Sequence, residues 1–233
     1  MCPIGLGDSI MMAGAAVVLS QRFGKLRVPT SPRYIESVKS FYVNHPEIEV
    51  YAVEPPIGQH WGRPPIESFH IEGMAIMCGH YLEWPSECNK SFAEWMYAQL
   101  EIDYRHRWDS CPIPLACESV KQIEVHPTVF VHEDAARGFT ILKSISKDAY
   151  HPVFGKSSML EHACAIRNAG EIHCIDSSMY HLIECLDTNA NLFLHRYSRC
   201  YRKVWFDFPS RKKWNIVTCR RGDWKEKYER VAA

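Results

Sequence analysis

Residues 1–53 alternate between apolar and polar blocks in a way that predicts strands separated by helices. Residues 10–23 form an apolar stretch rich in Ala and Met, which predicts a buried helix that Ser9 can cap. A second helix is expected to begin at Pro32 and to run to about Asn44. Strand patterns flank these helices at residues 1–4, 25–28 and 47–53. The order β-α-β-α-β indicates a parallel, Rossmann-like sheet.

The rest of the chain resumes this alternation after a middle part rich in loops. Residues 54–65 contain Pro-Pro twice and two Gly, which predicts a loop, and the prolines within residues 108–114 predict a linker. Residues 128–132 have a strand pattern, and Ser158 opens a helix with the Ser-x-x-Glu spacing of a capping box that ends at Gly170. Further helices are expected at residues 71–80, 90–100, 115–123 and 224–231, and a last strand at residues 191–195.

The most informative stretch is residues 171–186, which predict a short strand, a polar turn and a helix. The strand ends at Asp176, and Ser177 or Ser178 can cap the helix that follows. Open α/β sheets bind ligands where a strand ends and a helix begins, and the free N–H groups there favour an anion such as a phosphate. His181 lies about one turn into the helix, so it can turn toward the same place.

Charge and cysteine content add two constraints. The chain has 233 residues with 27 Lys and Arg against 27 Asp and Glu, so no overall charge attracts it to a polyanion. Residues 196–225, however, hold ten Lys or Arg and two Asp, a local net of +8 (ten minus two), which makes them a candidate contact for phosphates, nucleic acid or an anionic membrane. The ten Cys are scattered without a disulfide framework, which indicates a reducing cytosol.

We therefore expect an α/β protein made of two small Rossmann-like domains that face each other across a cleft. A chain of this length can bury the core of one large domain or of two small ones. The expected parts are an N-terminal domain at residues 1–112, a C-terminal domain at residues 113–210 and a basic, aromatic tail at residues 211–233 that packs back on the body.

Asp8 is the first candidate for chemistry. It lies between the Gly5-Leu-Gly7 turn and the start of a helix, where a carboxylate either complements the helix dipole or serves as a general base at the edge of the sheet. The turn is not a complete dinucleotide-binding fingerprint, because the third Gly is absent and Asp8 would repel a pyrophosphate.

His132 and Arg137 are the second candidates, since they follow the strand at residues 128–132. Arg137 can hold a phosphate through two hydrogen bonds at the sheet edge. The alternative is a surface loop in which Arg137 pairs with Glu133 or Asp134.

The turn at residues 176–181 is the third candidate and also has two interpretations. In the first, it is a capped helix with a core histidine whose ring nitrogens are hydrogen-bonded within the protein. In the second, it is a site where the hydroxyls of Ser177 and Ser178 bind a diphosphate together with the helix N–H groups. In the second case Asp176 or His181 contacts a sugar or ribose hydroxyl.

Two further possibilities stay open. A metal site would use His and Cys residues in the same region, of which His181 and Cys185 share a helix face, but no known zinc spacing is present. The full set would be His162, Cys164, His173, Cys174, His181 and Cys185. The aromatic side chains of the basic tail can stack the bases of a single strand, or they pack on the core with their charges in water.

Two motifs resemble those of a known enzyme family. Gly5-Leu-Gly7-Asp8 before an apolar helix resembles the opening Gly-Asp turn of the heptosyltransferase-type family nine of GT-B glycosyltransferases. Asp176-Ser177-Ser178-Met-Tyr-His181 resembles the Asp-[Thr/Ser]-Gly-x-x-His donor-binding motif of that family, with Ser178 in place of the Gly.

The resemblance implies a compact GT-B-like enzyme that moves a sugar from a nucleotide diphosphate-sugar to a hydroxyl acceptor with inversion. Asp8 would be the general base, beside Gly7, and no metal or other cofactor would be needed. The donor would bind near residues 176–181, His132 and Arg137, with Lys143 as a second choice for the basic phosphate ligand. The basic region that begins at Arg196 would bind donor phosphates or contact an anionic membrane.

Three functions thus compete on the sequence alone. The first is the metal-independent glycosyltransferase, located in the cytoplasm or peripherally at a membrane, with a glycan, a lipid or another hydroxyl compound as acceptor. The second is a non-catalytic nucleotide-binding module, which would use residues 176–181 but not Asp8. The third and least favoured is a nucleic-acid binder that depends on the tail, with affinity that falls steeply with salt.

Overall fold

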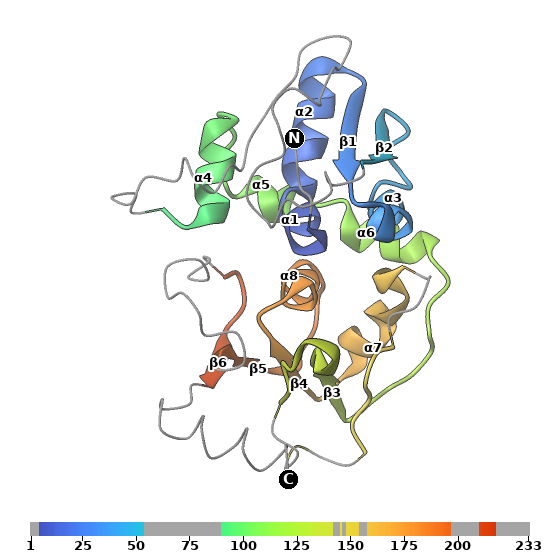
Figure 1. Cartoon of the computed structure of the whole chain (residues 1–233), viewed down its shortest axis with the longest axis vertical. Coiled ribbons are helices and arrows are strands. Elements are labelled where there is room, and N and C mark those ends of the chain that lie inside the picture. Colours follow the sequence, from blue (N-terminus) through green and yellow to red (C-terminus); the bar gives the residue numbers. More distant parts are fainter. Residues whose placement is uncertain are drawn as a thin grey trace.

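The computed structural model describes residues 5–53, 90–141, 145, 148–153, 158–196 and 210–217. These residues form an α/β protein with two sheets of parallel strands, as the sequence predicts. The N-terminal sheet and its helices occupy one end of the molecule, the C-terminal sheet occupies the other, and helices α1 and α8 meet between them (Figure 1). The domain boundaries at residues 112 and 210 stay a prediction.

The first helix begins earlier than expected and is broken in two. Helix α1 spans Leu6–Met11 and α2 spans Ala13–Phe23, with Met12 between them. Gly7 and Asp8 therefore lie in the first turn of α1 rather than before it. The prediction that Ser9 caps the helix was wrong, because Gly5 is the N-cap and the Ser9 hydroxyl donates to the Gly5 carbonyl at 3.0 Å. The strand expected at residues 1–4 lies outside the described residues.

A strand-helix-strand unit follows, as predicted. Strand β1 (Leu26–Thr30) pairs in parallel with β2 (Ile48–Ala52), and α3 (Ile35–Phe41), entered through the short helix η1 (Pro32–Tyr34), connects them. The side chains of Val38 and Phe41 on α3 are completely buried, so this helix covers the small sheet.

The middle of the chain is more helical than expected. Helix α4 (Phe92–Gln99) begins at a complete capping box between Ser91 and Glu94, whereas the expected loop at residues 54–65 and helix at 71–80 lie outside the described residues. Residues 108–114, which were predicted as a linker, are helical at both ends, and the domain boundary expected among them stays a prediction. They hold the end of α5 (His106–Asp109) and the start of α6 (Ile113–Ser119).

The C-terminal sheet contains four parallel strands in the order β3-β4-β5-β6. Its helical connections include a capped entry at Ser158, whose hydroxyl accepts from the Leu160 N–H at 3.2 Å. The elements are β3 (Val129–His132), η4 (Ala135–Arg137), η5 (Met159–His162), α7 (Ala163–Asn168), β4 (Glu171–Ile175), α8 (Ser178–Cys185), β5 (Asn191–His195) and β6 (Trp214–Val217).

Strand β6 is a finding that the sequence did not predict, since residues 191–195 were expected to be the last strand. Trp214 anchors β6, because its indole N–H donates to the carboxylate of Glu184 in α8. The same carboxylate accepts from the Ser210 hydroxyl at 2.7 Å and from the Arg211 N–H at 2.9 Å. A buried carboxylate with three donors thus fixes the start of this edge of the sheet.

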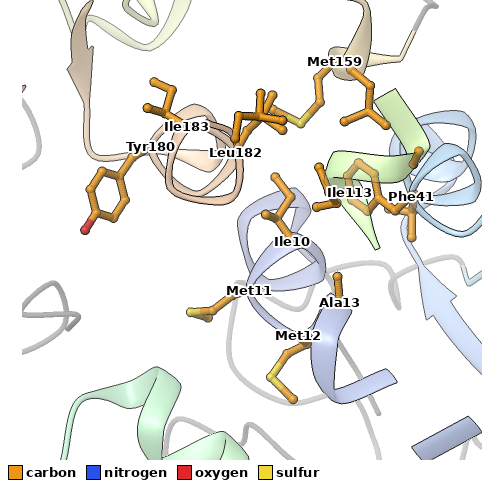
Figure 2. Close-up of a cluster of buried hydrophobic side chains, with 14 of the residues drawn as sticks. Ile10, Met11, Met12, Ala13, Phe41, Ile113, Met159, Tyr180, Leu182 and Ile183 are labelled. Carbon is orange, nitrogen blue, oxygen red and sulfur yellow. The ribbon is translucent and has the colours of Figure 1, made fainter. Parts of the chain in front are cut away.

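The two halves share one core at the contact of α1 with α8. Ile10 of α1 faces Leu182 of α8, with Ile113 of α6 and Phe41 of α3 beside them (Figure 2). All four side chains are completely buried. Each stabilises the fold by about 1.5–3 kcal/mol relative to an exposed position.

Within the described ranges, no helix is long and apolar enough to cross a membrane.

Candidate functional site

The carboxyl ends of the C-terminal strands bring several predicted residues to one edge of the sheet. His132 is the last residue of β3, Asp176 directly follows β4, and Arg196 directly follows β5. The register pairs His132 with Cys174 and Ile175 with His195, so the three strands end within one residue of each other. His132 and Asp176 are buried and Arg196 is half-buried. This is the edge at which parallel sheets bind ligands.

The start of α8 has the predicted capping arrangement. Ser177 is the N-cap, and its hydroxyl accepts from the Met179 N–H at 3.2 Å. Ser178 is the first helical residue and is half-buried, whereas His181, one turn further on, is only 6% exposed. Of the two serines that the sequence allowed as the cap, Ser177 is the one used.

The first turn of α1 lies directly against this start of α8. A Cβ atom placed on Gly7 would lie 3.6 Å from the Cα of Ser178 and 3.2 Å from Cδ2 of His181. Nε2 of His181 would lie 3.8 Å from the same Cβ, so the Cδ2–Nε2 edge of the ring faces Gly7. The two motifs singled out in the sequence, far apart along the chain, therefore meet.

Asp8 lies at the N-terminus of α1. A Cβ atom on Gly5 would be 2.9 Å from Oδ2 of Asp8, so the carboxylate folds back over the first turn of its own helix. This position complements the helix dipole, as one of the two sequence interpretations expected. Asp8 is half-buried, and the geometry is equally compatible with a carboxylate at the rim of a ligand site.

Arg107 of α5 is the central buried cation of this region, and the sequence analysis missed it. The side chain is completely buried, and its Nη2 donates to Nδ1 of His181 at 3.0 Å. Its Nη1 donates to the Tyr104 hydroxyl, and the guanidinium lies 5.3 Å from the ring of Trp108. Among the described residues, no carboxylate forms an ion pair with Arg107.

The surroundings of Arg107 keep its charge in place. Burial alone would lower its pKa, but the neighbouring Tyr104 and Cys185 outweigh this and leave the pKa raised. In the same contact region, the thiols of Cys111 and Cys185 share a hydrogen bond. This hydrogen bond, with the N–H of Ile113 and the charge of Arg107, holds the pKa of Cys111 below its ordinary value. The contact between α5 and α8 is thus a polar cluster within an apolar core.

The remaining phosphate-ligand candidates are not resolved by the geometry. The backbone of Arg137 lies in η4, in the loop after β3, but its side chain is outside the described part, as is Lys143. Glu133, one of the two possible partners of Arg137, accepts from the Ile141 N–H at 2.8 Å. The choice between a phosphate ligand and a loop ion pair therefore stays open.

The residues of the alternative metal site do not converge. His173 and Cys174 point to opposite faces of β4, because neighbours on a strand alternate. His162 is engaged elsewhere, with its Nδ1 2.8 Å from the Tyr150 hydroxyl. In the described part of the chain, no group of three or more His, Cys, Asp or Glu side chains is placed to hold a metal ion. The expectation that function needs no metal stays a prediction.

A pair of histidines, His173 of β4 and His195 of β5, lies on the face of the C-terminal sheet away from α8. Nδ1 of His173 is 2.9 Å from Nε2 of His195, and Nε2 of His173 is 3.3 Å from Glu171. His195 is the last residue of β5 and pairs in register with Ile175, so its side chain lies on the sheet face away from α8, and the sequence analysis did not single it out. Position at a strand end is the signal that could have indicated it, whereas Arg107 has no local signal beyond the aromatic neighbours Tyr104 and Trp108.

Comparison with family models, with curated proteins and with solved structures finds no match to this chain. The geometry itself is therefore the basis for a functional proposal. It combines a capped helix N-terminus, a buried cation behind a histidine, and a half-buried carboxylate on the opposing helix. Together these groups can bind an anion and accept a proton beside it.

Proposed function

We propose that the protein is an inverting glycosyltransferase, of compact GT-B-like organisation, that uses a nucleotide diphosphate-sugar. The observation that carries this proposal is the contact of Gly7 with Ser178 and His181. This contact puts the turn that carries Asp8 directly against the first turn of α8, whose N–H groups favour an anion. A transferase needs both, since one group must activate the acceptor and others must stabilise the leaving diphosphate.

Each group has a role in this reaction. The diphosphate accepts hydrogen bonds from the N–H groups of α8 and from His181, and Arg196 and Arg137 are further cations for its charge. Asp8 takes the proton of the acceptor hydroxyl as that oxygen forms a bond to the anomeric carbon. The bond from the anomeric carbon to the phosphate oxygen breaks, and its electron pair leaves with the nucleoside diphosphate, which inverts the configuration.

The chemistry proposed here requires no metal ion, because the helix N–H groups and the basic side chains offset the developing negative charge. The acceptor is a glycan, a lipid or another hydroxyl compound. We place the reaction in the cytoplasm, in keeping with the free thiols of the five cysteines in the described part of the chain. The basic tail would allow peripheral contact with an anionic membrane.

The donor is to be identified by a thermal-shift screen of UDP, GDP, ADP, CMP and their common sugars, with and without EDTA. A ligand that binds only the folded state stabilises it by about 2.7 kcal/mol at a hundred times its dissociation constant. We expect one nucleoside diphosphate to raise the melting temperature equally in EDTA. His181→Gln should abolish this shift, while His126→Gln, at an exposed histidine, should retain it.

Catalysis is then tested by release of the nucleoside diphosphate from the identified sugar nucleotide, with water as acceptor. Asp8→Asn should keep donor binding and lose at least about a hundredfold in rate, the range for a general base. Asp187→Asn, at an exposed aspartate, is the matched control. Nucleotide binding without release, or equal rates in Asp8→Asn and the parent protein, would favour a non-catalytic nucleotide-binding module instead.

A further inference from the structure

The contact between Arg107 and His181 restricts where the imidazole proton can be. Nη2 of Arg107 and Nδ1 of His181 are 3.0 Å apart, which is a hydrogen-bond distance. A guanidinium has only N–H donors and is always charged in proteins, so it cannot accept a hydrogen bond. Nδ1 must therefore present its lone pair to Arg107, and in the neutral ring the proton resides on Nε2.

This assignment gives the ring a direction as well as a proton. Because Nδ1 is turned to Arg107 on α5, the opposite edge of the ring is turned toward α1. That edge is the one that faces Gly7, with Nε2 3.8 Å from the Cβ position of that residue. The Nε2–H bond is thus directed toward Gly7, at the contact of α1 with α8.

The choice of arginine at position 107 also has a physical reason. The guanidinium donates to two acceptors on different elements, the Tyr104 hydroxyl beside it in the chain and His181 across the contact. It is completely buried and lies 5.3 Å from the ring of Trp108, which helps to hold it in one plane. A planar fork can satisfy this geometry, whereas a lysine ammonium is a point donor without a fixed plane.

We propose that Arg107 is a positioning residue that holds His181 as a hydrogen-bond donor, through Nε2–H, to the leaving diphosphate. The ligand named here rests on the proposed function. His181 then cannot be the base that receives the acceptor proton, since its Nδ1 lone pair is occupied and its Nε2 carries a proton. This leaves Asp8 as the base at the same junction and gives the two facing motifs separate roles.

The ring proton is tested first, without any ligand. Two-bond ¹H–¹⁵N correlation spectra of the full chain, labelled with ¹⁵N-histidine, distinguish a protonated from a lone-pair nitrogen in each ring. The chain has twelve histidines, and the signals of His181 are those lost in His181→Gln. We expect a lone pair on Nδ1 and a proton on Nε2 at neutral pH. A proton on Nδ1 would overturn the proposal, and this result does not depend on any Arg107 variant being folded.

Variants of Arg107 then test whether Arg107 fixes the tautomer of His181. Arg107→Met should remove the single tautomer and weaken nucleoside diphosphate binding about tenfold, the effect of one lost charge-assisted hydrogen bond. Arg107→Lys keeps the charge and one donor, so it should retain part of the preference for the Nε2–H tautomer and part of the affinity for the nucleoside diphosphate. Arg105→Met, at an exposed arginine in the same segment, should change neither. An unchanged tautomer in folded Arg107→Met would overturn the positioning role.

The two proposals can fail separately. If the ring carries its proton on Nε2 but no nucleoside diphosphate binds the parent protein, the proposed function is wrong and the assignment of the ring proton stands. If a nucleoside diphosphate binds and Arg107→Met binds it as tightly as the parent protein, the positioning role is wrong and the proposed function stands.

Discussion

Substitution of Gly7 by alanine tests the junction of α1 and α8 with the smallest possible change. The added methyl group would lie 3.2 Å from Cδ2 of His181, against 3.4–4 Å for an ordinary contact. The ring must therefore retreat by a few tenths of an ångström, although Arg107 holds its far side. Because Ser178 Cα lies 3.6 Å away on the same side, the backbone of α8 leaves no alternative space for the methyl group.

The net effect on stability follows from two opposing contributions. Overpacking costs about 1–3 kcal/mol, and alanine in place of glycine within a helix returns about 0.5–1 kcal/mol. The free energy of unfolding should therefore fall by about 0–2.5 kcal/mol, which urea denaturation can measure. The affinity for the donor should fall by about tenfold, because the Nε2–H bond of His181 is displaced from the ligand.

Two other glycines provide matched controls for Gly7→Ala. Gly24 ends α2 with a φ of +79° and has nothing within 4 Å of its Cβ position, so Gly24→Ala should cost about 1–2 kcal/mol in backbone strain and leave binding unchanged. Gly14→Ala should prevent folding, because its Cβ would lie 1.9 Å from the carbonyl oxygen of His106. If Gly7→Ala binds the nucleotide as tightly as the parent protein, the junction is not the binding site.

Further outcomes follow from buried titratable groups. Glu184→Gln should lower the free energy of unfolding by about 3 kcal/mol, because a buried carboxylate that accepts from three donors is replaced by an amide whose NH₂ group repels one of them. Glu118→Gln, at an exposed glutamate, should leave the free energy of unfolding unchanged. At pH 8, iodoacetamide should label Cys111 faster than Cys117, because burial raises the pKa of Cys117 to about 11 while hydrogen bonding with Cys185 lowers the pKa of Cys111. Both cysteines lie in the tryptic peptide of residues 108–121, so fragment-ion mass spectrometry of that peptide locates the label, and faster labelling of Cys117 would contradict this prediction. Burial holds the pKa of His162 below its ordinary value of 6.5, so the unfolded state binds more protons than the folded state. The free energy of unfolding should therefore fall as the pH drops below 6.5, by at most about 1.4 kcal/mol per pH unit. If the free energy of unfolding of His162→Gln falls equally over this pH range, the prediction is wrong.

The elements that the sequence predicted are those whose signal is local. Strands β3, β4 and β5 are runs of apolar residues bounded by polar turns, and the cap at Ser177 needs only the residue type and a following apolar face. The contact of Gly7 with Ser178 and His181 joins elements that belong with two different sheets, so the position of each turn along the chain did not predict it.

The features that the sequence did not predict depend on contacts between distant residues. Arg107 acts through His181, 74 residues away, and nothing in the residues around it indicates that partner. Strand β6 has only four residues and forms because Glu184 of α8 receives Trp214. The early start of α1 was missed for a local reason, because Gly5 caps the helix with its extended backbone and without a side-chain hydrogen bond that the sequence could indicate.

The most direct test of the central claim is hydrogen–deuterium exchange of the full chain, followed by mass spectrometry, with and without the nucleoside diphosphate found by thermal shift. If the two turns form one site, the ligand should slow exchange both in the α8 segment, residues 176–185, and in the α1 segment, residues 5–11. Slower exchange in the α8 segment alone would favour a non-catalytic nucleotide-binding module over a transferase. Protection confined to other segments would contradict the account.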